Sequence, residues 1–331
     1  MDVTLIIPNY NGEQYILQCL ESVYHEVDNP KNIIVIDNGS YDSSVRLIQR
    51  HYPDITLVVN EKNVGFAAAV NQGIELSNTE YVILLNNDAF AHPGYVRELV
   101  KCIASDETIF SVSAKMLRYN EPDIIDDAGD QLTIFGWAYK VGDGRPSHAY
   151  NKPRTIISAC AGAAIYRRKI FQYIGYFDER FFAYLEDVDI GVRANLAGYR
   201  NVYCPKAVVD HIGSAVSGSR HNEFKVHLAA RNNVMLLAKN FNALWLILLF
   251  PFLIIGFATK CSYFLKKKLI RSYTNGLWEG IQILAQDRSR STKWHLSKDI
   301  KDRHYWRTIK LMLRATVEYP LHKMMGSKHK S

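Results

Sequence analysis

Three carboxylates within four positions form the densest group of potentially catalytic side chains in the sequence. Glu186, Asp187 and Asp189 follow an aromatic run at 181–184. Like charges this close repel one another unless a helix N-terminus or a cation offsets the repulsion. In a partly desolvated pocket the pKa of such a group rises toward neutral, which suits a general base. We interpret Asp187 as the base, and Asp189 as an i,i+4 partner of Arg193 in a solvated first turn.

A second candidate group lies at Asn86-Asn87-Asp88, directly after the apolar run at 81–85. A hard divalent cation that bridges a diphosphate needs few protein carboxylates, because phosphate and water oxygens fill its other positions. Asp88 can therefore serve as a metal ligand. The alternative is that Asp88 only caps a turn or a helix.

His211 and Arg231 are further candidate ligands. His211 follows a strand-like run and is itself followed by Gly and Ser residues. It is either a metal ligand or a structural histidine with satisfied hydrogen bonds. The guanidinium of Arg231 can clamp a phosphate with two hydrogen bonds, although a single arginine on a helix is usually solvated.

The first half of the chain alternates short β-branched runs with helical patterns, which indicates an α/β fold with a parallel sheet. Ligands of such sheets gather at the carboxyl ends of the strands. Polar, turn-forming residues follow each strand, at 9–12, 37–40, 63–65 and 87–88. The expected strands are 3–8, 32–37, 55–60 and 81–85, and the expected helices are 15–24, 43–51 and 67–76.

Residues 89–150 are less regular, with a helix expected at 94–105 and a Gly- and Asp-rich region at 126–144. A strand is expected at 156–165. It contains a run of small residues that includes Gly162 and would let a ligand approach the backbone closely. Core packing explains the small residues equally well.

The positive charge of the chain is concentrated at its C-terminal end. Residues 1–259 carry 23 Lys and Arg against 28 Asp and Glu, whereas residues 260–331 carry 17 against 5. The basic segment follows an uncharged apolar stretch at 240–259 that is about long enough to cross a bilayer. This pattern favours an anionic membrane surface as partner and disfavours nucleic acid. A buried core helix is the alternative for the stretch.

The compartment is inferred from cysteines and from charge. The five cysteines are scattered and lack metal or redox spacing, which favours a reducing environment. The N-terminus shows no basic region or cleavage site of a secretory signal. The positive-inside rule places the basic cluster at 266–271 in the cytosol. We therefore expect a peripheral or re-entrant segment at the cytosolic face of the membrane.

Together, the motifs resemble those of the inverting family-two glycosyltransferases of the GT-A fold, and especially the rhamnosyltransferase-like members that build bacterial surface polysaccharides. The resemblance runs from Thr4 to Asn240, about 70% of the chain. It implies a GT-A catalytic domain at 1–239, with a nucleotide-binding half at 1–90 and an acceptor half at 91–239, and a helical membrane-associating region at 240–331. The motifs read TLIIPNYNG, VIDNGSYDSS, NEKNVGFAAAVNQGI, VILLNNDA, AGAAIYRRKIF, IGYFDERFFAYLEDVDI and VDHIGSAVSG.

The resemblance also implies roles for individual residues. Asp187 matches the general base, and Glu186 would hold the acceptor or tune the charge beside it. Asp88 and His211 match positions that hold a divalent cation, Mg or Mn; the residue at the first position of the family's Asp-X-Asp motif is Asn86 here. The implied nucleotide-sugar site consists of Pro8, Asn9, Tyr10, Asp37, Asn63, Gly65, Phe66, Asn71, Asn87, Gly162 and Arg231.

The implied reaction is a single displacement that inverts the anomeric carbon of a nucleotide-sugar donor. The expected donor is dTDP-L-rhamnose, and the expected acceptor is a hydroxyl of a saccharide or of a lipid-linked sugar. Two alternatives remain: the same fold with a UDP-sugar donor, or a non-catalytic nucleotide-sugar or lipid-binding scaffold. A dehydrogenase is disfavoured because no Gly-X-Gly-X-X-Gly follows the first strand. If the transferase interpretation is right, Asp187 and Asp88 face one shared cavity.

Overall fold

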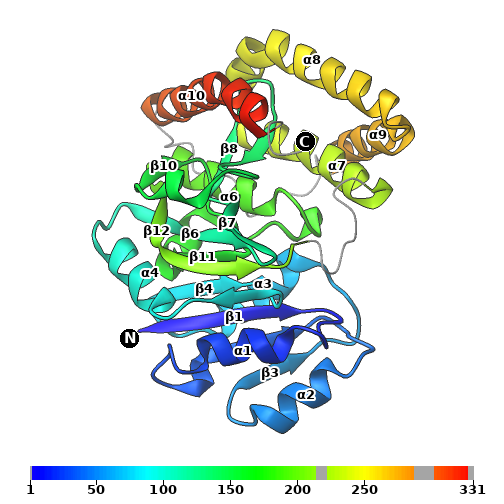
Figure 1. Ribbon diagram of the computed structural model, residues 1–331. Helices are drawn as coiled ribbons and strands as arrows, with labels where there is room; N and C mark the ends of the chain where they lie inside the picture. Colours follow the sequence, from blue (N-terminus) through cyan, green and yellow to red (C-terminus); the bar gives the residue numbers. More distant parts are fainter. Residues whose placement is uncertain (1, 214–221, 287–301, 327–331) are drawn as a thin grey trace.

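The computed structural model describes residues 2–213, 222–286 and 302–326, with the side chains of 302, 303 and 321–326 left out. Within these ranges one mixed sheet forms the centre of the molecule, and helices lie on both of its faces (Figure 1). The strands are β1 (Val3–Asn9), β2 (Ile33–Asp37), β3 (Thr56–Val59), β4 (Tyr81–Leu85), β5 (Ala89–Ala91), β6 (Ile109–Arg118), β7 (Glu121–Asp127), β8 (Asp130–Leu132), β9 (Ala138–Lys140), β10 (Arg154–Ile156), β11 (Ala163–Arg167) and β12 (Arg200–His211).

The α-helices pack against this sheet or gather at one end of the molecule. They are α1 (Ile16–Tyr24), α2 (Ser44–His51), α3 (Phe66–Leu76), α4 (Tyr95–Ala104), α5 (Arg168–Ile174), α6 (Glu186–Leu196), α7 (Glu223–Asn240), α8 (Ala243–Lys266), α9 (Ile270–Gln286) and α10 (Asp302–Gly326). Three short 3-10 helices are η1 (Pro30–Asn32), η2 (Ser147–Tyr150) and η3 (Glu179–Phe181).

The sheet has the order β10-β12-β6-β11-β4-β1-β2-β3. Outside this order, β5 pairs with β12 and β7 pairs with β6. β1 lies parallel to both β2 and β4, and β2 lies parallel to β3. The register sets Asn9 opposite Asp37, so the carboxyl ends of these strands meet at one edge. β11 is antiparallel to β4 and β6, which makes the sheet mixed. The predicted α/β fold is confirmed.

The apolar strands are buried because both faces of the sheet are covered. Along β1, Val3, Leu5 and Ile7 pack into one core cluster, and Ile6 packs into another on the opposite face. Successive side chains of a strand point to opposite faces, so a strand that is covered on both faces needs an unbroken apolar run. The same apolar run is the feature of the sequence that predicted β1.

The strand expected at 156–165 is wrong as a single element. β10 ends at Ile156 and pairs with β12, whereas β11 begins at Ala163 and pairs with β4 and β6. Between them the chain turns, and the amide of Ala163 donates to the carbonyl of Cys160. The small side chains at 159–164 permit this turn inside the core.

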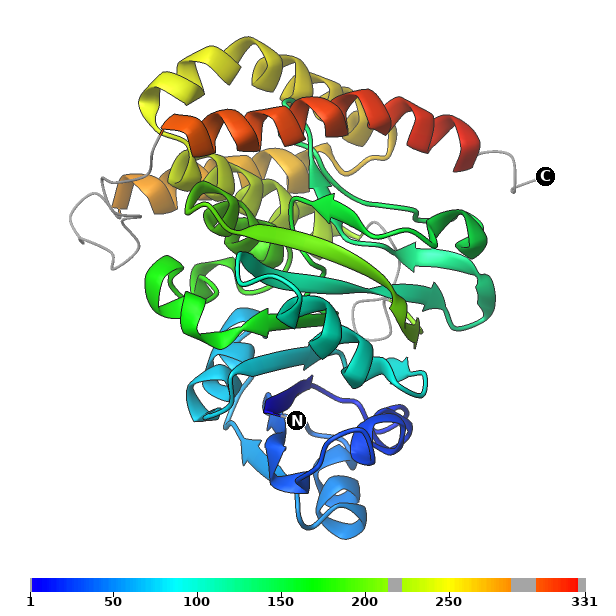
Figure 2. The same ribbon diagram turned by 90° about the vertical axis from the view of Figure 1, so that its left-hand side faces the viewer.

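The C-terminal helices are built into the molecule. α8 begins at Ala243 and continues to Lys266, seven residues beyond the end of the predicted apolar stretch at 240–259. Trp245 of α8 stacks on Tyr305 of α10, and both belong to a core that contains Phe181 and Val188. Both views show α8, α9 and α10 together at the end of the molecule opposite α2 and β3 (Figures 1 and 2). Helices α8 and α10 thus share a core with the residues that precede α6 and with α6 itself.

Candidate functional site

The carboxyl ends of β1, β2 and β4 are tied together by buried amides. The Asn9 side chain donates to Asp37 Oδ1 over 2.7 Å and accepts from Asn87 over 2.8 Å. Asp37 Oδ2 accepts from the amide of Ser40. These bonds fix three strand ends that the sequence predicted to line one edge. Both carboxylate oxygens of Asp37 already accept bonds within the protein, and its contact with a nucleotide base stays a prediction.

The loop before α3 contacts the aromatic run that precedes α6. Gly65 has a φ of +92°, and a Cβ there would lie 2.6 Å from the Phe182 ring. Glycine is required at this position on both counts. The amide of Phe66 donates to the Phe182 carbonyl over 2.6 Å, while the Asn63 side chain accepts from the Gly65 amide. Residues more than 110 positions apart in sequence thus meet at the N-terminus of α3.

The segment 181–185 adopts an unusual backbone that side chains from α7 hold in place. Phe182, Tyr184 and Leu185 all have positive φ. Such conformations persist only where their surroundings enforce them, and they cluster at functional sites. The fully buried Asn232 side chain donates to three carbonyls of this segment, those of Phe181, Ala183 and Tyr184.

Arg231 makes hydrogen bonds within the protein. Its guanidinium donates to the carbonyls of Arg180 and Phe181 and to the carboxylate of Glu279. The expected contact of Arg231 with a donor phosphate stays a prediction. Arg231 braces the segment that leads into α6.

Asn71 also makes hydrogen bonds within the protein. Its side-chain amide donates to the Phe177 carbonyl over 2.8 Å, and its oxygen accepts from the Phe177 amide. Both ends of the Asn71 amide therefore hold the chain that approaches α6, and the expected nucleotide contact of Asn71 stays a prediction.

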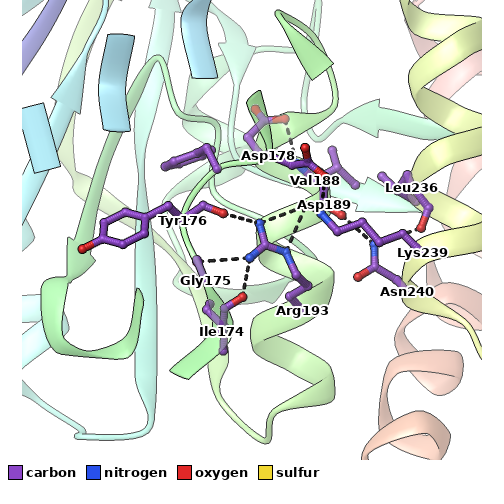
Figure 3. Close-up of polar contacts among 12 residues, drawn as sticks. Ile174, Gly175, Tyr176, Asp178, Val188, Asp189, Arg193, Leu236, Lys239 and Asn240 are labelled. Carbon is purple, nitrogen blue, oxygen red and sulfur yellow. Dashed lines mark hydrogen bonds and ion pairs between the residues drawn. The ribbon is translucent and has the colours of Figure 1, made fainter. Parts of the chain in front are cut away.

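A buried ionic network fixes α6 (Figure 3). Arg193 and Asp189 form an i,i+4 ion pair at 2.9 Å, with side chains 1% and 0% exposed. Arg193 also donates to the carbonyls at 174–176. Lys239 of α7 bridges Asp189 and Asp178 at 2.9 and 2.8 Å. The predicted pair is confirmed, but the expected solvated turn is wrong, because the pair lies in the core.

The network sets the position of Asp187 at the start of α6. One carboxylate oxygen of Asp187 accepts from the Val188 amide, and the other lies 3.4 Å from the Ala161 amide. Burial raises the pKa of Asp187, and this outweighs the lowering by the two amides and by Lys140. A helix N-terminus alone would weaken this carboxylate as a base. Burial supplies the opposing effect that a general base requires.

Asp88 and Asp187 are connected through one cluster of charged side chains. Asp88 lies 3.3 Å from Nε2 of His211, whose Nδ1 lies 2.9 Å from Asp126. Lys140 then pairs with Asp126 at 3.0 Å and with Asp127 at 3.8 Å. Burial, together with the nearby charges of Asp126 and Asp187, raises the pKa of Asp127 to about 7, although Lys140 opposes the shift. We call Asp126, Asp127, Asp130 and Lys140, together with Asp187, the acid cluster.

Sequence reasoning missed most of this cluster. It noted only that 126–144 is rich in Gly and Asp. The available signal was Asp126-Asp127-Ala128-Gly129-Asp130, which places three carboxylates within five positions around a glycine. That glycine has a φ of +92°, and the chain turns there from β7 into β8.

Among the residues that the structure describes, two groups could hold a cation. Asp88 and His211 offer an oxygen and a nitrogen, and the bond from Asp126 to Nδ1 leaves Nε2 to face Asp88. A carboxylate that orients a histidine ligand in this way is common in metal sites. Asp127, Asp130 and Cys160 also lie within 4.8 Å of one another. Burial raises the pKa of all three and Lys140 lies beside them, so the second group is the poorer cation site.

The remaining predicted residues line the same sheet edge. Pro8 lies in β1, and the Tyr10 ring stands edge-on to Tyr41 at 6.3 Å. The Gly162 carbonyl accepts from the Asn86 amide and so joins β11 to the Asp88 turn. The motif that follows His211 runs into residues 214–221, which lie outside the described part of the chain.

Comparison with known sequences gives a family match. Residues 4–175 match the profile of the family described as Glycosyl transferase family 2. The N-acetylglucosaminyl-diphospho-decaprenol L-rhamnosyltransferase of Mycobacterium tuberculosis (strain ATCC 25618 / H37Rv) is 26% identical over 266 residues, or 73% of this chain and 85% of that protein. The O-antigen chain rhamnosyltransferase WbaN of Salmonella anatum is 23% identical over 63% of this chain and 65% of that one.

Solved structures share the fold. The 1-349 fragment of S. aureus TarS in complex with UDP-GlcNAc superposes with a TM-score of 0.57 at 17% identity, over 97% of this chain and 92% of that one. The mannosyltransferase PcManGT from Pyrobaculum calidifontis, in complex with GDP-Man and Mn2+, gives 0.51 at 19%, over 97% and 87%. The predicted GT-A fold is confirmed.

The buried ion pair of α6 gives a stability prediction. Arg193→Met leaves Asp189 short of a partner and three carbonyls without donors, so we expect a loss of about 3–5 kcal/mol in the free energy of unfolding. Arg314→Met is the matched control, because Arg314 and Glu318 form an i,i+4 pair in which the arginine is 63% exposed. Its expected loss is below about 1 kcal/mol. Equal losses in chemical denaturation would show that burial of the pair does not matter.

His211 gives a pH prediction for the metal-free protein. Burial alone would lower its pKa, but the bonds to Asp126 and Asp88 raise it to about 9. Protonated His211 therefore stabilises the fold fully below about pH 6.5, and this stabilisation, up to about 3 kcal/mol, is lost as the pH rises through 9. Denaturation in EDTA from pH 6 to 10 should show this loss in the wild type and not in His211→Gln. Parallel curves would contradict the assignment.

Proposed function

Because the chain is a member of glycosyl transferase family 2, we propose that it inverts the anomeric carbon of a nucleotide-sugar donor while transferring the sugar to an acceptor hydroxyl. Asp187 is the general base. The observation that carries the proposal is its setting: a carboxylate whose pKa burial raises, at a helix N-terminus fixed by Arg193 and Lys239. Glu186 lies beside it, buried, with a pKa that burial and Asp187 both raise.

The proposed reaction is one displacement. Asp187 accepts the proton of the acceptor hydroxyl, and the acceptor oxygen bonds to the anomeric carbon as the bond from that carbon to the diphosphate oxygen breaks. The nucleoside diphosphate leaves with the electron pair. A divalent cation held by Asp88 and His211 would neutralise charge on the leaving diphosphate. Lys140 offsets the negative charge around Asp187, which keeps this base available in the ionised form.

For the donor we propose dTDP-L-rhamnose, and for the acceptor a lipid-linked sugar or saccharide at the cytosolic face of the membrane. Support comes from the two relatives named as rhamnosyltransferases, one of which is named for a diphospho-decaprenol substrate. The exposed apolar helix α8 supports a membrane location. The side-chain amides and the glycines at the carboxyl ends of β1, β2 and β4 form the proposed nucleotide site.

The role of Asp187 is tested by an isosteric variant. Asp187→Asn removes the basic oxygen, so we expect transfer to fall by about a hundredfold to ten-thousandfold. Donor affinity, measured by calorimetry, should stay unchanged. Asp123→Asn is the control, because Asp123 is an exposed carboxylate on β7. Wild-type turnover in Asp187→Asn would reject the base and favour a non-catalytic scaffold.

The donor is tested by nucleotide release in the presence of acceptor. We expect dTDP-L-rhamnose to be used at least about tenfold faster than UDP-sugars, which corresponds to a difference of about 1.4 kcal/mol in transition-state binding. EDTA should abolish release, and Mn2+ should restore it in the wild type but not in Asp88→Asn. A preference for a UDP-sugar would support the alternative donor, and full activity in EDTA would contradict the metal.

A further inference from the structure

α8 exposes large apolar side chains over most of its surface. Its most apolar 18-residue window has a mean hydropathy of 2.1, yet only 22% of that window is buried. A core helix would be mostly buried, so that alternative is wrong for the stretch around 243–266. Neighbouring α10 adds Trp306 and Val317, which are 57% and 72% exposed. The exposed apolar residues of α8 include Leu244, Ile247, Leu248, Phe250, Ile254 and Ile255, each at least half exposed.

Basic residues lie at the C-terminal end of the same helix. Lys266, Lys267 and Lys268 are exposed where α8 ends, and Arg271 is exposed at the start of α9. An apolar face beside a group of cations is the arrangement that binds an anionic bilayer. Each cation near such a surface adds to the affinity for the bilayer. A protein partner would need acidic groups around an apolar groove, whereas lipid headgroups supply the charge and the acyl chains supply the apolar phase.

The opposite face of α8 is attached to the protein along its whole length. At its N-terminal end Trp245 contacts Tyr305 and Trp306, with ring centroids 5.9 and 4.9 Å apart. At its C-terminal end Phe264 contacts Tyr273 of α9 at 4.9 Å.

These contacts exclude a transverse orientation. If α8, about 36 Å long, crossed a bilayer, α10 with Arg307 and Arg314 would enter the hydrocarbon with it. The geometry therefore requires that the helix lie along the membrane plane.

The middle of α8 holds the hairpin that leads to the acid cluster. Trp137, near the tip of the β8–β9 hairpin, donates from its indole N–H to the Gly256 carbonyl over 3.1 Å. A Cβ at Gly256 would lie 2.1 Å from the Phe135 carbonyl, so only glycine permits this approach. The strands of the hairpin begin at Asp130 and end at Lys140. The five residues from Phe135 back to Asp130, at about 3.3 Å each, place Asp130 of the acid cluster within about 17 Å of the contact with α8.

We propose that the exposed face of α8 docks flat on an anionic bilayer and presents the acid cluster to an acceptor anchored in that bilayer. The docking of α8 on a bilayer is inferred from the contacts and exposure of α8 alone. The presentation of the acid cluster to an anchored acceptor rests on the proposed function. The hairpin links α8 to Asp130 and Lys140 of the acid cluster, so the substrate class that we propose is an acceptor whose sugar is carried by a lipid headgroup.

Vesicle flotation tests the docking without any activity. The full-length wild type should float with vesicles of phosphatidylglycerol and phosphatidylethanolamine, float less with phosphatidylcholine alone or at high salt, and be released by alkaline carbonate. The double variant Ile247→Glu, Ile254→Glu should bind more than about tenfold more weakly, because two exposed side chains leave the apolar phase. The control Leu76→Glu, Tyr173→Glu changes two exposed apolar residues elsewhere and should bind like the wild type.

Three results would overturn the docking surface. In the first, the α8 variant floats as well as the wild type. In the second, the wild type stays on the vesicles after carbonate, which indicates a spanning helix. In the third, the protein self-associates through α8 in solution without binding vesicles; a second copy is then the occupant, and sedimentation of the wild type and the variant detects it.

The presentation of the acceptor is tested by measuring turnover on a vesicle-embedded lipid-linked acceptor and on a water-soluble analogue. The α8 variant should lose turnover on the embedded acceptor by about tenfold or more and keep wild-type turnover on the soluble one. Equal losses on both acceptors would contradict the inference. If the wild type transfers to neither acceptor, the proposed function fails, whereas the flotation result still decides the docking surface.

Discussion

The site depends on one buried ionic arrangement, in which Asp189 is neutralised by Arg193 from its own helix and by Lys239 from α7. Buried ion pairs are expensive to desolvate and are weak evidence for added stability. Here the pair specifies an orientation, because Arg193 also binds the chain at 174–176 and so allows one placement of α6. That placement puts Asp187 at the helix N-terminus and turns it toward the Ala161 amide.

The two halves of the site meet through backbone atoms. The Phe182 carbonyl accepts from the first amide of α3, and Gly65 leaves the space that the Phe182 ring fills. The segment 181–185 is held in its left-handed conformations by Asn232. The loop at the sheet edge and the segment that leads into α6 are therefore held together by direct contacts.

Periodicity was sufficient to predict the first half of the fold, since β1, β4 and the helices between them follow from runs that bury both faces of a sheet. The Asp189–Arg193 pair followed from spacing, although its burial did not, because burial depends on α7, whose Lys239 lies 50 positions beyond Asp189. Asp127 and Asp130 were missed for a related reason. A carboxylate in a turn is expected to be solvated. In this protein β8 and the residues around Asp187 bury these carboxylates. The structural contacts of Arg231 and Asn71 were also missed, because their backbone partners lie more than 45 residues away.

The proposed reaction requires a nucleotide-sugar between Asp88 and Asp187. A crystal structure with Mn2+ and a non-transferable dTDP-sugar, with the metal located by anomalous scattering, measures this placement. We expect the Mn2+ peak beside Asp88 and Nε2 of His211, and the anomeric carbon facing the Asp187 carboxylate. A peak between Asp127, Asp130 and Cys160, or an anomeric carbon turned away from Asp187, would rule out the proposed site.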